Sequence, residues 1–301
     1  MLITILLPTY NYANYIEKCI QSILEQTYKD YELLVLDDGS IDNTTEIVER
    51  IKDKRIHYLK NPANLGIVET LNLGIKLAKG KYIARMDADD IMVGNRLQMQ
   101  VDFLDQNPQF GIVGSWYKIM DSNGRIISEM KNYTDPDYLR LGLMFTNHFA
   151  HPTVMMRTKL VKKLLYDKNF LHCEDHELWT RFSEISKVTN LPFFFLNVRS
   201  HSQSTCNLNQ KELKTSVIKL LSKELNKKGI CHTPKELMLH ASICFGSSKK
   251  LVGQKEVEND LRQWFEKIFS SSYLKKNFSQ YMLDTFKVNI MKNAGLETEQ
   301  E

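Results

Sequence analysis

NLGIVETLNLGIKLAKGKYIARMDADD, residues 64–90, is the stretch that decides the fold class of this 301-residue chain. Residues 64–80 carry apolar side chains at helical spacing, and Gly80 is a C-cap signal that closes the predicted helix. Residues 81–90 predict a strand that runs into an acidic turn. A helix that leads directly into a short apolar strand is typical of a βαβ unit.

The same alternation of strand and helix precedes this stretch. Helices are predicted over 12–26 and 41–53, and strands over LITILLP (2–8), YELLVLDDGS (31–40) and RIHYLKN (55–61). Such alternation implies a mainly parallel sheet with right-handed crossovers. Parallel sheets bind ligands at the carboxyl ends of their strands, and the polar clusters PTYN, DDGS and DADD all stand at those ends.

The pattern changes after about residue 109. Antiparallel strands are predicted around the turn Asp121–Gly124, and the later segments are a helix over 135–145, a strand over 151–157, a helix over 174–185 and closing strands over 188–201. Beyond residue 208 the sequence is helical and Lys-rich. We therefore expect an α/β domain over 1–207 and a helical C-terminal region over 208–301.

The composition is that of an ordinary globular protein, with 43% hydrophobic and 25% charged residues and a net charge of +4. The five cysteines form no C-x-x-C pair, which indicates reduced thiols in the cytosol. No signal peptide is recognised, and the apolar run 191–198 is too short to span a bilayer. We expect a cytoplasmic protein that does not cross a membrane.

The acidic turn that ends the fourth predicted strand is the first candidate site. Extended geometry places Asp87 and Asp89 on one face, where their carboxylates repel each other unless a cation lies between them. Mg²⁺ and Mn²⁺ prefer oxygen ligands and phosphate co-ligands, so either ion would suit. An exposed acidic turn is the alternative, but two other polar strand ends in the same sheet favour a metal site.

Two further acidic positions each have two interpretations. Asp38 can accept hydrogen bonds from a ribose hydroxyl or a base N–H, although Asp37–Ser40 by itself favours a turn with helix capping. Asp175 begins a predicted helix, where it either caps the helix or acts as a general base. His151 and His201 are expected to be structural, because no Cys/His cluster supports a zinc site. The first strand–helix turn has no G-x-G-x-x-G, so no dinucleotide fold is indicated.

Four segments together resemble the family 2 glycosyltransferases, inverting enzymes of the GT-A fold that include bacterial surface-polysaccharide and lipopolysaccharide types. The segments are PTYNYANYIEKCIQSILEQTYKDYELLVLDDGSIDNT (8–44), NLGIVETLNLGIKLAKGKYIARMDADD (64–90), HPTVMMR (151–157) and EDHELWTRF (174–182). The resemblance covers about 1–205 and is specific for family and fold, less so for donor and acceptor. It implies a nucleotide-sugar-binding half over 1–100 and an acceptor half over 101–207.

The resemblance also implies roles for individual residues. Asp38 is similar to the carboxylate that contacts the nucleotide base or ribose, and Asp175 to the catalytic base. Asp87-Ala88-Asp89 resembles the D-x-D motif, in which Asp87 would reach the ribose or the metal and Asp89 would ligate the metal. His201 is implied near the diphosphate and the metal. The remaining donor-site positions are Pro8, Thr9, Tyr10, Asn64, Gly66 and Arg85.

The function implied is metal-dependent, inverting transfer of a sugar from a nucleotide-diphosphate sugar to a hydroxyl of a glycan or lipid-linked glycan. A UDP-hexose is the favoured donor, Mn²⁺ or Mg²⁺ the cofactor, and nucleic acid is not an expected partner. The Q-x-x-R-W motif and the transmembrane helices of processive relatives are missing, so we expect one sugar, or a few, per acceptor. A sugar nucleotidyltransferase and a non-catalytic nucleotide- or glycan-binding module stay open as alternatives.

The C-terminal region mixes lysines with aromatic residues over 249–292. Lysines on one face of a helix and aromatics on the other suit contact with anionic lipid, but also packing onto the main domain or a second subunit. Acidic residues dilute the basic face, which favours packing. A peripheral contact with the inner face of the cytoplasmic membrane and a homo-oligomer through these helices stay open. The aromatics are Trp264, Phe265, Phe269, Tyr273, Phe278, Tyr281 and Phe286.

Overall fold

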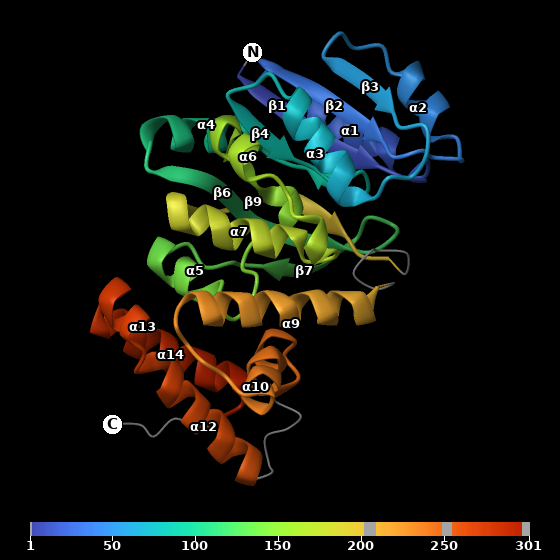
Figure 1. Cartoon of the computed structure of the whole chain (residues 1–301). Helices are drawn as coiled ribbons and strands as arrows, with labels where there is room; N and C mark the ends of the chain where they lie inside the picture. Colours follow the sequence, from blue (N-terminus) through green and yellow to red (C-terminus); the bar gives the residue numbers. More distant parts are fainter. Residues whose placement is uncertain (1, 202–208, 249–254, 297–301) are drawn as a thin grey trace. The chain divides into compact units, whose positions relative to one another are not determined.

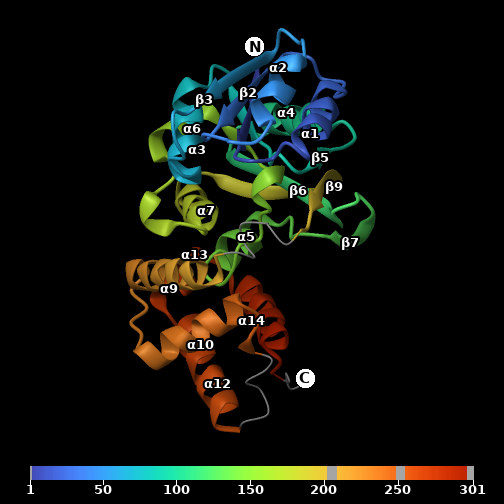
Figure 2. The same cartoon turned by 90° about the vertical axis from the view of Figure 1, so that its right-hand side faces the viewer.

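The computed structural model describes residues 2–201, 209–248 and 255–296, and these divide into two compact units. The first unit contains residues up to 134 and from 149 to 208, and the second contains 135–148 together with the chain from 209 onward. Figures 1 and 2 show the helices and strands of each unit from two sides. The domain boundary expected at 207/208 assigned residues 135–148 to the first domain, whereas the structure assigns them to the second unit.

The first unit is built on a sheet whose N-terminal half is parallel. Strands β1 (Ile3–Thr9), β2 (Tyr31–Asp37), β3 (Ile56–Lys60) and β4 (Tyr82–Arg85) lie in the order β3-β2-β1-β4, and each adjacent pair is parallel. Every residue of β1, β2 and β4 is buried, as expected for the continuous apolar runs of strands covered on both faces. The predicted βαβ arrangement is confirmed.

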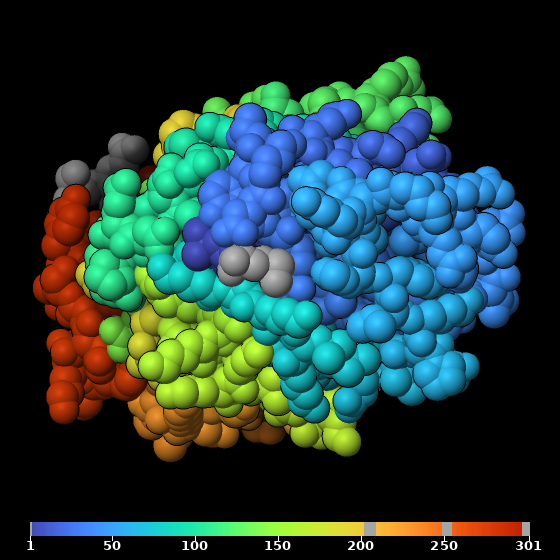
Figure 3. All heavy atoms as spheres, turned by 90° about the horizontal axis from the view of Figure 1, so that it is seen from above, coloured from blue at the N-terminus to red at the C-terminus, as the bar shows by residue number. Residues whose placement is uncertain are grey.

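Helices connect these strands and cover the sheet: α1 (Ile16–Leu24), α2 (Thr44–Arg50), α3 (Ile67–Leu77) and, after β4, α4 (Arg96–Gln106). The segments of the first hundred residues, blue to cyan, lie together on the face that Figure 3 shows. Gly80 is not the C-cap of α3, since the cap is Ala78. A Cβ on Gly80 would lie 2.4 Å from the backbone nitrogen of Thr4, so glycine is required there by the close approach of β1.

The C-terminal half of the sheet is mixed rather than parallel. Strand β8 (Met155–Arg157) is antiparallel to both β4 and β6 (Phe110–Met120), whereas β9 (Lys187–Arg199) runs parallel to β6. Strand β7 (Ile126–Met130) adds to β6, and β5 (Ile91–Met92) adds to β9. The predicted turn at Asp121–Gly124 joins β6 and β7. The strand expected over 151–157 begins instead with a 3₁₀ turn, η1 (His151–Thr153).

Two α-helices and a 3₁₀ helix follow β8 in the first unit: α6 (Thr158–Leu164), η2 (Lys168–Phe170) and α7 (Glu174–Ile185). One apolar core spans this unit and contains residues of β1, β2, β4, α1 and α4 together with Val113, Met155 and Leu196. The later strands therefore share a core with the parallel half, and the loops at the carboxyl ends of the strands are held on a rigid base.

The second unit is helical in its described parts. Its helices are α5 (Pro136–Gly142), α9 (Gln210–Lys227), α10 (Pro234–Cys244), α12 (Lys255–Phe269), α13 (Ser272–Asn277) and α14 (Gln280–Ala294). Its own apolar core joins residues 138–145 to the C-terminal helices. Helix α5 was expected from the sequence, but its membership of this core was not.

The aromatic residues of the C-terminal region mostly face this core. Five are buried, Tyr273 is partly buried against them, and Tyr281 is 81% exposed; the buried ones are Trp264, Phe265, Phe269, Phe278 and Phe286. They pack within the second unit, where the ring of Phe286 contacts those of Tyr138 and Phe145, residues that the sequence had assigned to the main domain. Among the described residues, no helix is both long and apolar enough to cross a bilayer.

Candidate active site

The loops that follow β1 and β2 are tied together by hydrogen bonds at the carboxyl edge of the sheet. The backbone N–H of Asn11 donates to Ser40 Oγ (2.8 Å), and that of Ile41 donates to Asn11 Oδ1 (2.9 Å). The Ala13 N–H donates to Asp42 Oδ2 (3.0 Å). Asn11 adopts a positive φ of 59°, which asparagine tolerates better than most residues. The edge is therefore preorganised.

Asp37, the first carboxylate of the DDGS segment, is structural. It is completely buried, and its two oxygens accept hydrogen bonds from the Ser40 N–H (2.7 Å) and the Tyr58 hydroxyl (2.5 Å). Both oxygens are thus committed to closing the turn after β2 and tying it to β3. This is the turn role that the residue types alone favoured.

Asp38 holds the loop that leads into α3. Its carboxylate accepts hydrogen bonds from Asn61 Nδ2 (2.8 Å) and from the backbone N–H groups of Leu65 (2.9 Å) and Gly66 (2.8 Å). The Gly66 N–H also donates to Asn64 Oδ1 (3.1 Å). The structure therefore brings together Asp38, Asn64 and Gly66, three of the residues predicted for the donor site. The partners of the Asp38 carboxylate are thus Asn61 and the loop that leads into α3, which the sequence had not indicated.

The end of β1 lies beside Asp38. In the sheet Pro8 is opposite Leu36, and the Asp38 N–H donates to the carbonyl of Thr9 (2.8 Å). Thr9 is 3% exposed, and its hydroxyl has no hydrogen-bond partner among the residues described. Tyr10 is 41% exposed at the rim. The Thr9 hydroxyl is therefore a buried polar group that could donate a hydrogen bond to a ligand or accept one from it.

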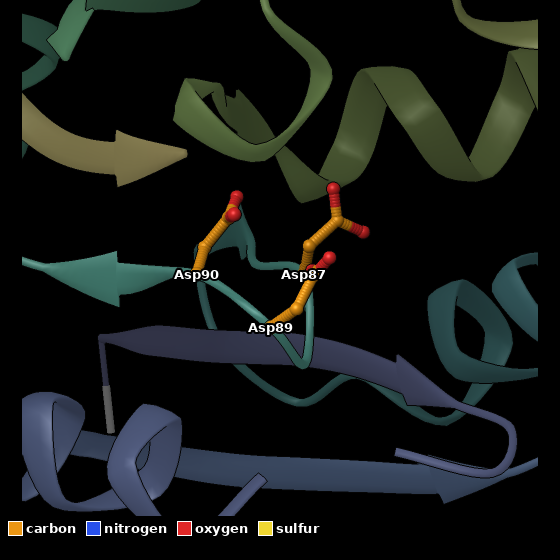
Figure 4. A group of neighbouring side chains, drawn as sticks. All are labelled: Asp87, Asp89 and Asp90. Carbon is orange, nitrogen blue, oxygen red and sulfur yellow. The ribbon is translucent and has the colours of Figure 1, made fainter. Parts of the chain in front are cut away.

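Three carboxylates gather directly after β4, on the same side of one short loop (Figure 4). Ligand oxygens of Asp87, Asp89 and Asp90 lie within 4.8 Å of one another. Burial raises the pKa of Asp89 and of Asp90, and the neighbouring carboxylates raise both pKa values further. Asp90 Oδ2 is buried without a hydrogen-bond partner in the described chain. Ala88, between the first two, is 3% exposed. The sequence identified Asp87 and Asp89 but not Asp90.

Arg85 provides a positive charge next to this turn. Its guanidinium, on a side chain 5% exposed, forms an ion pair with the carboxylate of Asp87. A second guanidinium, that of Arg96, is completely buried and donates to the carbonyls of Arg85 (2.9 Å) and Val154 (3.3 Å). Burial lowers the pKa of Arg96 to about 9. Arg96 thus supports the backbone of β4 just before the acidic turn, a role for which the sequence has no signal.

Arg199, at the end of β9, fixes the acidic turn from the other side. Its N–H donates to Asp90 Oδ1 (2.9 Å) and its Nε donates to the carbonyl of Asp89 (2.9 Å). Its Nη1 donates to the carbonyls of Asp121 (3.1 Å) and Ser122 (3.0 Å). The guanidinium also lies 4.8 Å from the ring centroid of Tyr15. Arg199 therefore contacts three separate segments, and it was missed because none of them is near it in sequence.

His201 lies two residues beyond Arg199 and contacts the same turn. Its Nε2 is 2.9 Å from Asp89 Oδ2, and its ring stacks on that of Tyr15 with centroids 5.4 Å apart. The structure thus brings together Asp87, Asp89 and His201, the residues predicted for the metal. A neutral imidazole that meets a buried carboxylate can become a metal ligand or donate to that carboxylate.

The start of α7 places two more acidic residues near this edge. Glu174 is buried, and burial together with the Asp175 carboxylate raises its pKa to about 7. The carboxylates of Asp175, Glu174 and Asp87 and the Arg85 guanidinium all act on the pKa of the buried Tyr166 phenol, which burial raises. Asp175 and Asp87 therefore both lie within electrostatic range of the Tyr166 phenol.

His151 is structural, as the sequence favoured. Its Nε2 is 2.7 Å from the hydroxyl of Tyr166, and its ring meets that of Trp179 edge-on with centroids 5.7 Å apart. Burial and the Arg85 guanidinium hold its pKa well below the ordinary value. His151 is thus a neutral packing residue that orients Tyr166 beside the site.

The family model of glycosyl transferase family 2 matches residues 4–165. The chain belongs to this family. A glycosyltransferase of Haemophilus influenzae without an assigned activity is 31% identical over 245 residues, which are 76% of this chain and 76% of that protein. The Escherichia coli protein WfgD, a UDP-Glc:alpha-D-GlcNAc-diphosphoundecaprenol beta-1,3-glucosyltransferase, is 32% identical over 216 residues, 71% of this chain and 83% of WfgD. Membership makes this chain a glycosyltransferase rather than a nucleotidyltransferase or a binding module.

Similar solved structures show the same fold. Staphylococcus aureus TarS in complex with UDP-GlcNAc aligns with a TM-score of 0.61 at 17% identity, over 100% of this chain and 94% of that one. The Pyrobaculum calidifontis mannosyltransferase PcManGT, in complex with GDP-Man and Mn²⁺, aligns with a TM-score of 0.58 at 17% identity, over 96% of this chain and 86% of that one. The first unit thus has the expected GT-A fold, and helices follow it.

Proposed function

We propose that this family 2 glycosyltransferase moves a hexose from a UDP-sugar to a hydroxyl of a glycan acceptor, with inversion and with a divalent metal. The observation that carries the proposal is the gathering of three carboxylates after β4, with ligand atoms within 4.8 Å. The proposal assigns Asp175 to the same site. A metal-binding turn can offset the leaving-group charge, and a separate carboxylate can act as the general base of single-displacement transfer.

The residues of the acidic turn fit Mn²⁺ or Mg²⁺. Hard divalent cations take carboxylate oxygens, and Asp90 Oδ2 is a buried oxygen without a hydrogen-bond partner in the described chain. In the proposal Asp89 and Asp87 hold the ion, with His201 against Asp89 as a further ligand or as its hydrogen-bond partner. When bound, the ion would offset the charge that develops on the departing nucleoside diphosphate. The Mn²⁺ bound by PcManGT, a protein of the same fold, supports this assignment.

Asp175 is the proposed catalytic base. It would take the proton of the acceptor hydroxyl as that oxygen attacks the anomeric carbon from the face opposite the leaving group, which inverts the configuration. General-base assistance of this kind contributes about 10²–10⁴-fold to rate. Glu174, whose pKa is raised to about 7, is buried behind it and is therefore proposed to support rather than replace it.

The donor pocket is proposed to lie between the ends of β1 and β2 and the start of α3. The loop that Asp38 holds carries Asn64 and Gly66, and the Thr9 hydroxyl is left for a ligand. UDP is favoured as the nucleotide because WfgD uses UDP-Glc and the TarS structure holds UDP-GlcNAc. The remaining wall residues of the proposed pocket are Pro8, Tyr10, Arg85 and Ala88.

The acceptor is proposed to be a glycan carried on a lipid diphosphate, and transfer to be non-processive. WfgD, with 32% identity, acts on such an acceptor. In this proposal residues 1–100 bind the donor, 101–207 contribute the acceptor side, and the helices from 208 onward hold the protein near the inner face of the cytoplasmic membrane. Homo-oligomerisation through those helices is a further proposal.

The test is a transfer assay with a panel of UDP- and GDP-sugars and lipid-diphosphate GlcNAc acceptors, with EDTA and with Mn²⁺ or Mg²⁺ restored. We expect transfer from a UDP-hexose that EDTA abolishes and Mn²⁺ restores, and an inverted linkage by NMR. Transfer that is unaffected by EDTA would contradict the metal assignment, and use of a GDP-sugar alone would contradict the UDP assignment.

A further inference from the structure

Arg85 is a buried cation whose hydrogen-bonding capacity is not used up. It is 4% exposed, it forms an ion pair with Asp87, and its Nε–H has no acceptor in the described part of the chain. Buried guanidinium groups are normally both paired and hydrogen-bonded, because leaving a buried N–H without an acceptor is unfavourable. An unused N–H on a planar guanidinium is what a phosphate oxygen would take up.

Asp87, the partner of Arg85, also belongs to the acidic turn. Its ligand oxygen lies within 4.8 Å of those of Asp89 and Asp90, while one of its oxygens is paired to Arg85. The Asp87 side chain is 35% exposed and so has room to change rotamer, whereas the Arg85 side chain is 5% exposed. Asp87 therefore pairs with a fixed guanidinium and also belongs to the group of carboxylates that would hold a divalent ion.

An Arg85 guanidinium without an anionic partner would be unfavourable in these surroundings. The fully buried Arg96 guanidinium is close enough for the charges of Arg85 and Arg96 to oppose each other. If Asp87 turned fully to a metal ion, Arg85 would lose its ion-pair partner beside another cation. Removal of one partner from a buried ion pair is strongly unfavourable. Some other anion must then take the place of Asp87.

We infer that Arg85 exchanges Asp87 for a diphosphate oxygen of the donor when metal and nucleotide bind together. This inference rests on the proposed function. In the free protein Arg85 holds Asp87; in the loaded protein Asp87 serves the metal and the guanidinium takes the phosphate, so every charge stays paired. Metal alone leaves Arg85 unpaired, so metal and nucleotide must bind cooperatively, and each must favour the other by the same factor.

A purely structural Arg85–Asp87 ion pair makes the opposite prediction. If Arg85 only supports the shape of the turn, its removal should weaken the metal site and leave the coupling to nucleotide unchanged. If it competes for Asp87, its removal should strengthen binding of metal alone and reduce the coupling. The sign of one binding change therefore separates the two roles.

The experiment is calorimetric titration of Mn²⁺ into the full-length protein, with and without saturating UDP. In the wild type we expect UDP to tighten Mn²⁺ binding about tenfold or more, within the usual range of coupling. In Arg85→Gln we expect Mn²⁺ alone to bind about tenfold more tightly than in the wild type, with the UDP effect reduced below about threefold. Arg55→Gln is the matched control, because Arg55 also pairs with an aspartate two residues away, Asp53, outside the site; it should match the wild type.

Mn²⁺ binding that is unchanged or weaker in Arg85→Gln, or a UDP effect equal to that of the wild type, overturns the inference. If Arg85→Gln does not fold, Arg85→Lys decides: the charge is kept, so Mn²⁺ alone should bind as in the wild type, while the coupling should fall because a lysine lacks the planar fork. Wild-type coupling in Arg85→Lys would then refute the exchange. A wild-type protein that binds neither Mn²⁺ nor UDP contradicts the proposed function itself.

Discussion

The acidic turn after β4 and the core of the second unit both bury ionisable groups, but the turn leaves two of their atoms without hydrogen bonds, whereas His240 in the core is hydrogen-bonded at both ring nitrogens. In the core His240 is fully buried, its Nε2 donates to the carbonyl of Met144 (2.7 Å), and its Nδ1 accepts from Trp264 Nε1 (3.1 Å). At the turn Asp90 Oδ2 and Arg85 Nε are buried without hydrogen-bond partners in the described chain. Unsatisfied buried groups reduce stability, so a protein that keeps them has another use for them.

Four changes test this contrast: three replace a residue of the candidate active site, and one replaces His240 in the core of the second unit. At the acidic site we expect losses of activity or ligand binding with little loss of stability. In the second unit we expect losses of stability. A variant that lost both equally would show that the two regions do not differ in the way proposed.

The largest effect is expected for Asp175→Asn. The amide has the shape of the carboxylate but cannot accept the proton, so turnover should fall by about 10²–10⁴-fold while UDP-sugar affinity stays constant. Single-turnover rates and donor titration measure the two quantities. Glu184→Gln, near the exposed end of the same helix, is the control and should be fully active. A parallel fall of donor affinity and rate would make Asp175 a binding or capping residue.

Asp89→Ala should come next, with metal-dependent transfer reduced by about 10²–10³-fold because the leaving-group charge is no longer offset. Without metal its melting temperature should equal or exceed that of the wild type, since a buried carboxylate in a repulsive cluster is removed. The Mn²⁺-induced rise in melting temperature should disappear. Asp53→Ala, outside the site, should keep that rise. Full activity in Asp89→Ala would refute the metal assignment.

In the second unit, low pH should reduce the stability of the protein through protonation of His240. Burial lowers the pKa of His240 from 6.5 to about 4. The folded state therefore binds fewer protons than the unfolded state, and the stability that His240 contributes above pH 6.5 is lost as pH falls through 6.5 toward 4. The size of this effect is roughly 3 kcal/mol. Urea unfolding at pH 7.5 and 4.5 measures it, and His240→Gln should flatten the dependence.

The control for this pH effect is His57→Gln. The side chain of His57 is 51% exposed and belongs to β3 of the first unit, so this variant replaces a histidine without changing the core of the second unit. If His240→Gln keeps the wild-type dependence, acid destabilises the protein through other groups, and the core histidine does not have the role assigned to it.

The smallest effect is expected for Arg199→Lys. Lysine keeps the charge but cannot reach the carbonyls of Asp89, Asp121 and Ser122 at once, so the acidic turn loses part of its support. We expect Mn²⁺ affinity to fall by about tenfold, with kcat little changed once metal is saturating. Metal titration of the transfer rate gives both values. An equal loss of kcat at saturating metal would show that Arg199 does more than position the turn.

Local patterns predicted most of the first unit. The run of residues 64–90 was expected to form a helix, a strand and an acidic turn, and α3, β4 and the carboxylates of Asp87 and Asp89 are found there. The helical assignment of 135–145 was right for α5, but its place in the core of the second unit was not foreseen. Gly80 was explained by a helix cap, whereas the real constraint is the backbone of β1.

The sequence by itself determined the elements whose signal is local: the apolar period of each strand and helix, and the carboxylates that alternate at a strand end. Only the tertiary structure decided which groups share a charge or a hydrogen bond. It joined Arg199 to the acidic turn from 110 residues away, engaged Asp38 with the start of α3, and paired Arg85 with Asp87. The physical reason is that periodicity follows from backbone geometry within a few residues, whereas these pairings depend on strand order and register across the whole sheet.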